Sequence, residues 1–506
     1  MARRIPTTPL QRSGHRFQVH RQEQAFIRRD VRGLPSPFAQ QTAAISAAMV
    51  LAVIIAAIML IASILKPRPD RGMDAIIITQ SSGRYVMFDG ALHPVTNLAS
   101  ARLIVGSPDK AATVRDSTVV DIPRGPLMGI PSAPDSMDAH TDDPAKWTVC
   151  DQRSTRANLS LLASKKVDTT LIAGRDMLDP DAHVLDDRQA VLVRSLTAPD
   201  TLWIVFNGHR AEIGRQDFAT HSALGLTQSK IDDAIFLNGA TVDAIDVLPA
   251  LTIPFIDNRG RQSAVIPTNV IGDVLTTGDS EGGRVHFVVA DGGVQRITPL
   301  VAALLVNTGS RQQVQSNPEV INAYPQVQVI DVNRYPKNVP DILTPVTLCY
   351  SWERGRDDAM ARTQIITGDS LPLKQDKLPF LQDLLIPDPG VVQADKIAMD
   401  PGLGWYVRVT GSAVTSANTE QLMYIDDTGT RYFISPDAGG QYEPVIGALG
   451  LNTQLPMVIP WSIAKLYVQG STLSIDAART FHAYIPPNKF GVPAPARPGS
   501  VPQPPR

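Results

Sequence analysis

The sequence has few cysteines and lacks the common nucleotide-binding and metal-binding motifs. Its 506 residues include only two cysteines, too few for a disulfide-rich small scaffold or a multi-cysteine zinc domain. No Gly-Lys dipeptide occurs, so the G-x-x-x-x-G-K-[ST] phosphate loop is absent, and none of the nine histidines forms H-E-x-x-H. The formal net charge of −2 gives no reason to expect nucleic-acid binding. These absences exclude the best-known routes to metal and nucleotide chemistry.

Hydrophobic residues and prolines are plentiful. Hydrophobic residues make up 43% of the chain and charged residues 19%, which is enough apolar material to build packed cores. There are 41 prolines, and a high proline content predicts many turns and short elements rather than long helices. The length corresponds to about three domains or a string of smaller units. We therefore expect a strand-rich α+β fold.

One long apolar run lies near the N-terminus, at residues 42–65. It is uncharged and mostly apolar, and a helix of this length measures roughly 36 Å, enough to cross a hydrocarbon core of about 30 Å. A cleaved signal peptide is the alternative, but the run is too long and starts too far from Met1. The sequence predicts a single transmembrane helix at 42–65.

The segment before this run, residues 1–41, is basic. Residues 1–40 contain eight arginines against Glu23 and Asp30, a sum of +6. Its apolar residues lead us to expect a basic amphipathic helix that contacts membrane lipid or a cytoplasmic partner. Three arginines close to the span place the N-terminus in the cytoplasm and the remaining chain outside it, across an inner membrane: Arg28, Arg29 and Arg32.

The two cysteines, Cys150 and Cys349, both follow the predicted span. An even pair in an oxidising compartment predicts a disulfide, although two buried free thiols remain the alternative. The bond would join residues 136–198 to residues 330–397 as one core domain.

Four similar segments surround this core in the sequence. Each contains an apolar strand, a turn at glycine, a second short strand and a small apolar helix. We expect four small repeats, at residues 74–135, 199–261, 262–329 and 398–485, arranged around the core domain in an elongated periplasmic region. Their hairpin turns are predicted at Asp89 and Gly90, Asn207 and Gly208, Asp291 and Gly292, and Thr428 and Gly429. Residues 486–506 form a proline-rich tail.

No catalytic, metal-binding or cofactor-binding residue is predicted. Gly278 to Gly282 fits G-x-S-x-G around Ser280, but a strand is expected after it rather than before it, so we interpret it as a surface turn. The acidic run from Asp179 to Asp187 lacks the central glycine of a calcium-binding loop, and we interpret it as a solvated loop.

Several strings resemble the EccB family of mycobacterial type VII (ESX) secretion systems. They are SGHRF (13–17), IRRDVR (27–32), LHPVTNLASARLIVGSP (92–108), RGPLMGIPSAP (124–134), and the cysteine contexts KWTVC and PVTLCYSW. The resemblance covers the whole chain. It implies a cytoplasmic N-terminus and a periplasmic region with a disulfide-linked core and four repeats.

The resemblance also implies a function and partners. EccB proteins assemble with the EccC motor ATPase, EccD, EccE, a mycosin protease and other EccB copies into a hexameric inner-membrane complex. Some members carry an ATPase label, which would make ATP a ligand, but this sequence has no Walker motif. We expect a structural component of the secretion machinery, with a nucleotide hydrolase as the alternative.

Overall fold

The computed structural model describes residues 8–29, 37–65, 75–153, 167–278, 283–315, 318–385, 392–417 and 421–485. The chain divides into two compact units, Met1–Met73 and Asp74–Arg506. Each unit is described by itself.

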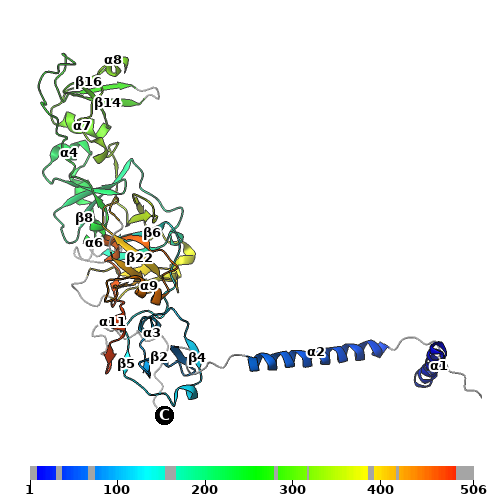
Figure 1. Ribbon diagram of the computed structural model, residues 1–506. Coiled ribbons are helices and arrows are strands. Elements are labelled where there is room, and N and C mark those ends of the chain that lie inside the picture. Colours follow the sequence, from blue (N-terminus) through cyan, green and yellow to red (C-terminus); the bar gives the residue numbers. More distant parts are fainter. Residues whose placement is uncertain are drawn as a thin grey trace, which may run out of the picture. The chain divides into compact units, whose positions relative to one another are not determined.

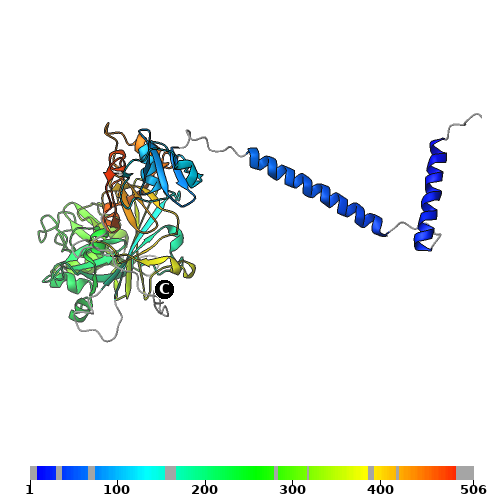
Figure 2. The ribbon, with the colours of Figure 1, turned by 90° about the horizontal axis from the view of Figure 1, so that it is seen from below.

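The first unit contains two helices, α1 (Pro9–Arg28) and α2 (Pro37–Leu65), drawn in blue in Figures 1 and 2. Thr8 starts α1 with a capping box, in which its hydroxyl accepts from the Gln11 N–H and the Gln11 side chain accepts from the Thr8 N–H. The helix α2 contains the predicted segment 42–65. Within the described residues, no helix is both long enough and apolar enough to cross a membrane.

The prediction of an amphipathic helix before residue 42 is corrected by α1. The helix is present, but its apolar residues do not share a face. At roughly 100° per residue, Phe17 and Phe26 lie on opposite sides of α1. The side chain of Phe17 is 66% exposed and that of Phe26 is 90% exposed. Spacing, rather than composition, decides whether a helix is amphipathic.

The second unit is built on a central six-stranded sheet with the order β19-β18-β6-β7-β21-β20. Two short 3₁₀ helices, η3 (Arg175–Met177) and η5 (Gln375–Phe380), follow its strands. The strands come from two distant parts of the chain: β6 (Ala145–Arg153), β7 (Val167–Ala173), β18 (Thr347–Arg354), β19 (Arg362–Gly368), β20 (Leu381–Asp383) and β21 (Lys396–Ala398).

Four further sheets define what we call modules 1 to 4. In each, the first strand pairs antiparallel with the second, the second with the third, and a strand after the helix returns parallel to the first. Module 1 contains β1 (Ile76–Thr79), β2 (Arg84–Phe88), β3 (Ala91–Pro94), α3 (Leu98–Val105), β4 (Ala112–Val114) and η1 (Asp116–Val119). It also holds β5 (Leu127–Met128), which pairs with β27 (Phe481–His482) from the C-terminal part of the chain.

Modules 2 and 3 follow one another in the sequence. Module 2 contains β8 (Gln189–Ser195), β9 (Leu202–Phe206), β10 (His209–Ile213), α4 (Phe218–Ala223), α5 (Gln228–Asp232), β11 (Ile235–Leu237), α6 (Gly239–Ala244), β12 (Asp246–Val247) and β17 (Asp341–Leu343). Module 3 contains β13 (Val274–Gly278), β14 (Arg284–Ala290), β15 (Gly293–Ile297), α7 (Pro299–Asn307), β16 (Gln312–Val314), α8 (Pro318–Asn322) and η4 (Val332–Arg334).

Module 4 lies near the C-terminus of the described chain. It contains β22 (Trp405–Thr410), β23 (Leu422–Ile425), β24 (Thr430–Phe433), α9 (Glu443–Leu449), β25 (Met457–Pro460), α10 (Trp461–Ala464), β26 (Val468–Gln469) and α11 (Ile475–Ala478). In modules 2 and 4, a fifth strand runs parallel to the third, β12 beside β10 and β26 beside β24. In modules 1 and 3 that position is reduced to parallel bridges, Leu92 with Arg124 and Val294 with Gln326.

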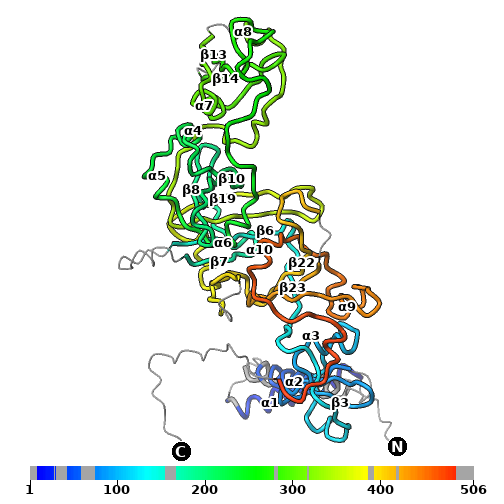
Figure 3. The backbone as a smooth tube through the Cα atoms, turned by 90° about the vertical axis from the view of Figure 1, so that its left-hand side faces the viewer, coloured from blue at the N-terminus to red at the C-terminus, as the bar shows by residue number. Residues whose placement is uncertain are grey.

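Three hydrophobic cores connect the modules. The first joins modules 2 and 4 to the central sheet, the second joins module 2 to module 3, and the third joins module 4 to module 1. Helices meet at each junction: α6 packs on α10, α4 on α7, and α3 on α9. Modules 2 and 4 are therefore the inner modules, and modules 1 and 3 are the outer ones (Figure 3).

One predicted domain boundary is corrected. Residue 198 was expected to end the core domain, but β8 lies before it and pairs with β9 in module 2. The segment β17, also expected in the core, pairs with β8. Both strands read as apolar runs in the sequence, and a short apolar run does not reveal which sheet it will join.

Candidate functional site

The two cysteines form a disulfide at the middle of the central sheet. In the antiparallel register of β6 and β18, Cys150 lies directly opposite Cys349, and Trp147 lies opposite Trp352. The Cys150–Cys349 bond is present and buried, which confirms the prediction. It spans 199 residues of sequence, and chain entropy puts the stabilisation from such a loop near 5 kcal/mol as an upper figure. The bond locks together the two chain segments that carry the inner modules.

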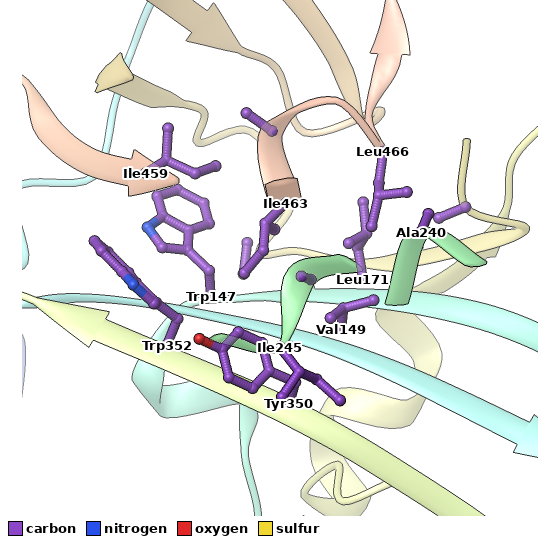
Figure 4. Close-up of a cluster of buried hydrophobic side chains, with 14 of the residues drawn as sticks. Trp147, Val149, Leu171, Ala240, Ile245, Tyr350, Trp352, Ile459, Ile463 and Leu466 are labelled. Atoms are coloured by element: carbon purple, nitrogen blue, oxygen red, sulfur yellow. The ribbon is translucent and has the colours of Figure 1, made fainter. Parts of the chain in front are cut away.

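A buried aromatic cluster covers one face of these strands. The Trp147 indole N–H donates to the Val458 carbonyl at 2.7 Å, and its ring meets the Trp405 ring edge-on with centroids 4.9 Å apart. Figure 4 shows Trp147 beside Ile459 and Ile463 of module 4, with Ala240 of module 2 also in the cluster. Aromatic side chains of this size contribute strongly to a core. This face is where both inner modules join the central sheet.

A buried carboxylate ties module 2 to the central sheet. Asp151, next to the disulfide on β6, is 1% exposed. Its oxygens accept from the Thr169 hydroxyl at 2.8 Å, the Thr241 hydroxyl at 2.9 Å and the Asn238 N–H at 2.6 Å. Burial raises the pKa of Asp151 to about 7, against the smaller opposing effect of these donors and with a further increase from Asp395. Asp151 was not predicted from the sequence, where its only signal is its place directly after Cys150.

The inner modules each place an arginine at an equivalent position, partly buried in module 2 and buried in module 4. In module 2, the Arg210 Nε donates to the Ile245 carbonyl at 3.1 Å, and its guanidinium lies 4.3 Å from the Trp203 ring centroid. Asp243 lies 3.8 Å from Arg210. Burial lowers the Arg210 pKa, and the nearby carboxylates Asp243 and Asp246 oppose that shift.

Module 4 repeats the hydrogen bond without the carboxylates. The Arg431 Nε donates to the Tyr467 carbonyl at 3.1 Å, and its guanidinium lies 5.4 Å from the Phe433 ring and 5.1 Å from the Trp461 ring. The position of Asp243 is held by Lys465, and these two residues form an ion pair at 3.8 Å between the modules. The two inner modules therefore contact each other through equivalent positions of opposite charge.

The four predicted turns all lie between the second and third strands of their modules. Gly90, Gly208, Gly292 and Gly429 have φ between 75° and 87°, the left-handed region that glycine adopts without strain. Asp89 and Asn207 also have positive φ, at 49° and 48°, as a type I′ hairpin requires. Asp291 and Thr428, which precede their glycines, are not among the described residues with positive φ.

The inner turns touch the central sheet, and the outer turns do not. A Cβ on Gly208 would collide with Thr363 of β19, and one on Gly429 would lie 2.9 Å from Ile397 of β21. A Cβ on Gly90 or Gly292 would meet no atom within 4 Å. The inner glycines are therefore required by both the turn and the packing.

A cleft with charged walls lies on the central sheet. It has a volume of about 420 Å³ and is lined by Lys146, Arg175 and Lys374 together with Asp176 and Asp179. Glu353 pairs with two of the cations, Arg175 at 2.5 Å and Lys146 at 3.8 Å. Burial lowers the Lys146 pKa, and Glu353 opposes that shift. Much of the positive charge is thus already neutralised.

The structure describes some predicted residues only in part. Arg28 ends α1, Arg29 follows it with φ of 53°, and Arg32 lies outside the described residues. Ser280 and the tail 486–506 also lie outside them. Among the residues that the structure does describe, no group of three or more His, Cys, Asp and Glu side chains could hold a metal ion.

Comparison with known proteins gives the family. Residues 4–487 match the family model described as "Type VII secretion system ESX-1, transport TM domain B". The chain belongs to the EccB family. It is 32% identical over 489 residues to "ESX-5 secretion system ATPase EccB5" of Mycobacterium tuberculosis (strain ATCC 25618 / H37Rv), covering 95% of this chain and 94% of that one. It is 32% identical to "ESX-3 secretion system ATPase EccB3" of Mycolicibacterium smegmatis, covering 96% and 93%.

Chains of solved ESX complexes share the fold. A chain of the intact ESX-5 inner membrane complex has 29% identity and a TM-score of 0.71, covering 98% of this chain and 99% of that one. The EccB3 dimer from the ESX-3 core complex has 30% identity and a TM-score of 0.69, covering 80% of this chain and all of that one. This EccB chain therefore has a strand-rich α+β fold like those found in ESX inner membrane complexes.

Proposed function

We propose that this protein is a structural membrane component of a type VII secretion system. It would assemble the periplasmic part of the inner-membrane translocon for protein export. The observation that carries the proposal is the disulfide-locked central sheet, to which both inner modules attach through buried cores. The four modules are thereby held in fixed positions around one central sheet, and a scaffold protein needs such fixed surfaces to bind several partners at once. The similarity to chains of the ESX-5 complex and to the EccB3 dimer supports the same role.

We further propose a single-pass topology and a set of partners. The apolar residues 42–65, within α2, would span the inner membrane once, with the arginine-rich N-terminus in the cytoplasm and residues 74–506 in the periplasm. Modules 1 to 4 would be the four repeats of the family, since they share one strand order. Partners would be EccC, EccD, EccE, a mycosin protease and other EccB copies in a hexameric complex, with membrane lipid around the span.

The scaffold proposal is tested by native mass. The full chain, tagged at its C-terminus, would be solubilised gently, run on a native gel and analysed for co-migrating proteins. We expect one large species that contains several copies of this chain and an EccC-type motor. A monomer in every detergent tested would refute membership of a stable complex.

A second candidate function is nucleotide hydrolysis within the same complex. It is favoured by the names of the EccB5 and EccB3 relatives, which include the word ATPase. The cleft near Lys146 is where phosphates would bind, through Lys146, Arg175 and Lys374, in competition with the carboxylates that already face these cations. Purified protein free of motor ATPase should then hydrolyse ATP, and Arg175→Gln should abolish the activity. Equal phosphate release by the parent, the variant and buffer would eliminate this function.

A further inference from the structure

Arg431 of module 4 is a buried cation that has no carboxylate beside it among the described residues. The residue is 7% exposed, and its Nη1 is buried without a hydrogen-bond partner in the part of the chain that the structure describes. The guanidinium is held by the Nε bond to the Tyr467 carbonyl and by the rings of Phe433 and Trp461. Burial lowers the Arg431 pKa, and no described carboxylate opposes that shift. Because a guanidinium stays protonated in proteins, a positive charge remains there without a balancing anion.

Module 2 shows how the same position is neutralised within one module. Arg210 and Arg431 occupy the same register position, and each donates through Nε to the carbonyl directly before the fifth strand. The Asp243 carboxylate lies 3.8 Å from Arg210, and both Asp243 and Asp246 oppose the effect of burial on the Arg210 pKa. The charge of Arg210 is therefore balanced by acidic residues of its own module.

Module 4 carries neither of these acidic residues. Counted back from the shared carbonyl, Asp243 corresponds to Lys465, and counted forward, Asp246 corresponds to Val468. Lys465 forms an ion pair with Asp243 across the module junction, at 3.8 Å. Asp243 thus already faces two cations. A carboxylate that balances Arg431 has to come from beyond the described residues.

Two aromatic side chains lie beside Arg431, at positions where module 2 has none. By the same count, Phe433 and Trp461 correspond to Glu212 and Gly239. The Trp461 and Phe433 ring centroids are 6.3 Å apart, and Trp461 is 39% exposed. Arginine and tryptophan are the residue types that contribute most to binding at protein interfaces. We call these three side chains, Arg431, Phe433 and Trp461, the Arg431 site.

The charge and the rings of the Arg431 site indicate what it binds. The Arg431 Nη2, unlike Nη1, is not enclosed without a partner, so a carboxylate can reach it from outside the module. A two-fold contact between two copies, centred here, would bring Arg431 against Arg431, and like charges that face each other are repulsive. The rings favour an apolar side chain next to the acid over a free inorganic anion.

We propose that the Arg431 site binds an acidic side chain of a different protein chain. The Asp or Glu carboxylate of the partner would pair with the Arg431 guanidinium, in the role that Asp243 has beside Arg210. An apolar neighbour of that acid would pack on Trp461 and Phe433. This proposal deepens the proposed scaffold function and rests on it, since it assigns one contact between the scaffold and a partner.

The first test compares two matched substitutions in the full-length protein. Arg431→Met and Arg210→Met each remove a cation and the same Nε bond, but only Arg210→Met leaves carboxylates of its own module without their partner. We therefore expect Arg210→Met to lower the melting temperature by several degrees more than Arg431→Met. An equal or larger loss in Arg431→Met would overturn the proposal, because it would show that Arg431 already has an anionic partner within its own chain.

The second test identifies the occupant by photo-crosslinking in cells that express the full chain. The probe is p-benzoylphenylalanine in place of Trp461, which keeps an aromatic ring beside Arg431. We expect a crosslink to a different protein, at a peptide that contains Asp or Glu. Adding Arg431→Met should lower the crosslinking yield at least about tenfold, as expected for the loss of one member of a close charge pair. Adding Arg210→Met should leave the yield unchanged, because that charge is already balanced.

Three results of the crosslinking would overturn the proposal. They are a crosslink only to a second copy of the chain, a crosslink to no protein at all, and a yield that does not change with Arg431→Met. The second result would leave a lipid phosphate or a free anion as the occupant. A native gel of the same membranes separates these results from failure of the scaffold function: a large species without the crosslink would refute the Arg431 site alone, whereas a monomer would refute the complex as well.

Discussion

The inner and outer modules share one strand order but differ in how they are attached. Modules 2 and 4 have a complete fifth strand, an arginine hydrogen-bonded to the backbone just before it, and turn glycines packed against the central sheet. Modules 1 and 3 have parallel bridges in place of that strand, and open space around their turn glycines. Leu92 and Val294 stand where the inner modules have Arg210 and Arg431. The same strand order is therefore used in two ways. Modules 2 and 4 pack against the central sheet, whereas modules 1 and 3 are attached only through the inner modules.

The largest effect should come from removing the disulfide that fixes the inner frame. Cys150→Ser with Cys349→Ser should lower the free energy of unfolding by about 2–5 kcal/mol, because the unfolded chain regains the entropy of a long loop. Denaturant unfolding of the protein with and without the bond measures it. Unchanged stability would show that the strand pairing alone holds the central sheet together.

The turn glycines give a direct comparison of inner and outer modules. Alanine at Gly90 or Gly292 should cost about 1–2 kcal/mol, because a residue with a Cβ is strained at positive φ. Alanine at Gly208 or Gly429 should cost more, since it must also displace Thr363 or Ile397. Thermal unfolding of the four single variants measures the difference. Equal losses of stability at all four positions would show that contact with the central sheet does not constrain the turns of the inner modules.

The buried Asp151 predicts a pH dependence of stability. Its pKa is raised to about 7 by burial, above the ordinary value near 4, so the folded state holds this proton more tightly than the unfolded state. The contribution of Asp151 should therefore be most favourable below about pH 4 and decline as the pH rises to about 7. The free energy of unfolding of the parent and of Asp151→Asn, measured at several pH values, isolates the pH-dependent contribution of Asp151, because the variant lacks the carboxyl group. Parallel stability curves for the two proteins would contradict it.

The smallest effect is expected from the ion pair between the inner modules. Lys465 and Asp243 lie 3.8 Å apart, and the Asp243 side chain is 61% exposed. A double-mutant cycle with Lys465→Met and Asp243→Asn should give a coupling of about 1 kcal/mol or less. A coupling of several kcal/mol would mean that charge, rather than the apolar contact of α6 with α10, joins the modules.

The sequence revealed the parts of this fold that depend on local chemistry. The glycine turns were readable because a tight hairpin needs positive φ, and Cys150 and Cys349 were readable because both follow the apolar run. The strands β8 and β17 were predicted in the core domain rather than in module 2, since a short apolar run does not indicate which strand it will pair with. Asp151 was missed because its donors, Thr169, Asn238 and Thr241, come from separate elements. These features depend on contacts between residues far apart in the sequence, which a local sequence pattern does not reveal.

Hydrogen exchange across the second unit tests most directly whether the central sheet and modules 2 and 4 form one stable core to which modules 1 and 3 are attached. Amides of β6, β18, α6 and α10 should exchange together and most slowly, because they share the central core and the disulfide. Amides of β2 in module 1 and β14 in module 3 should exchange faster and independently of that group. Uniform protection of inner and outer modules, or faster exchange in β6 and β18 than in β2 and β14, would contradict the account.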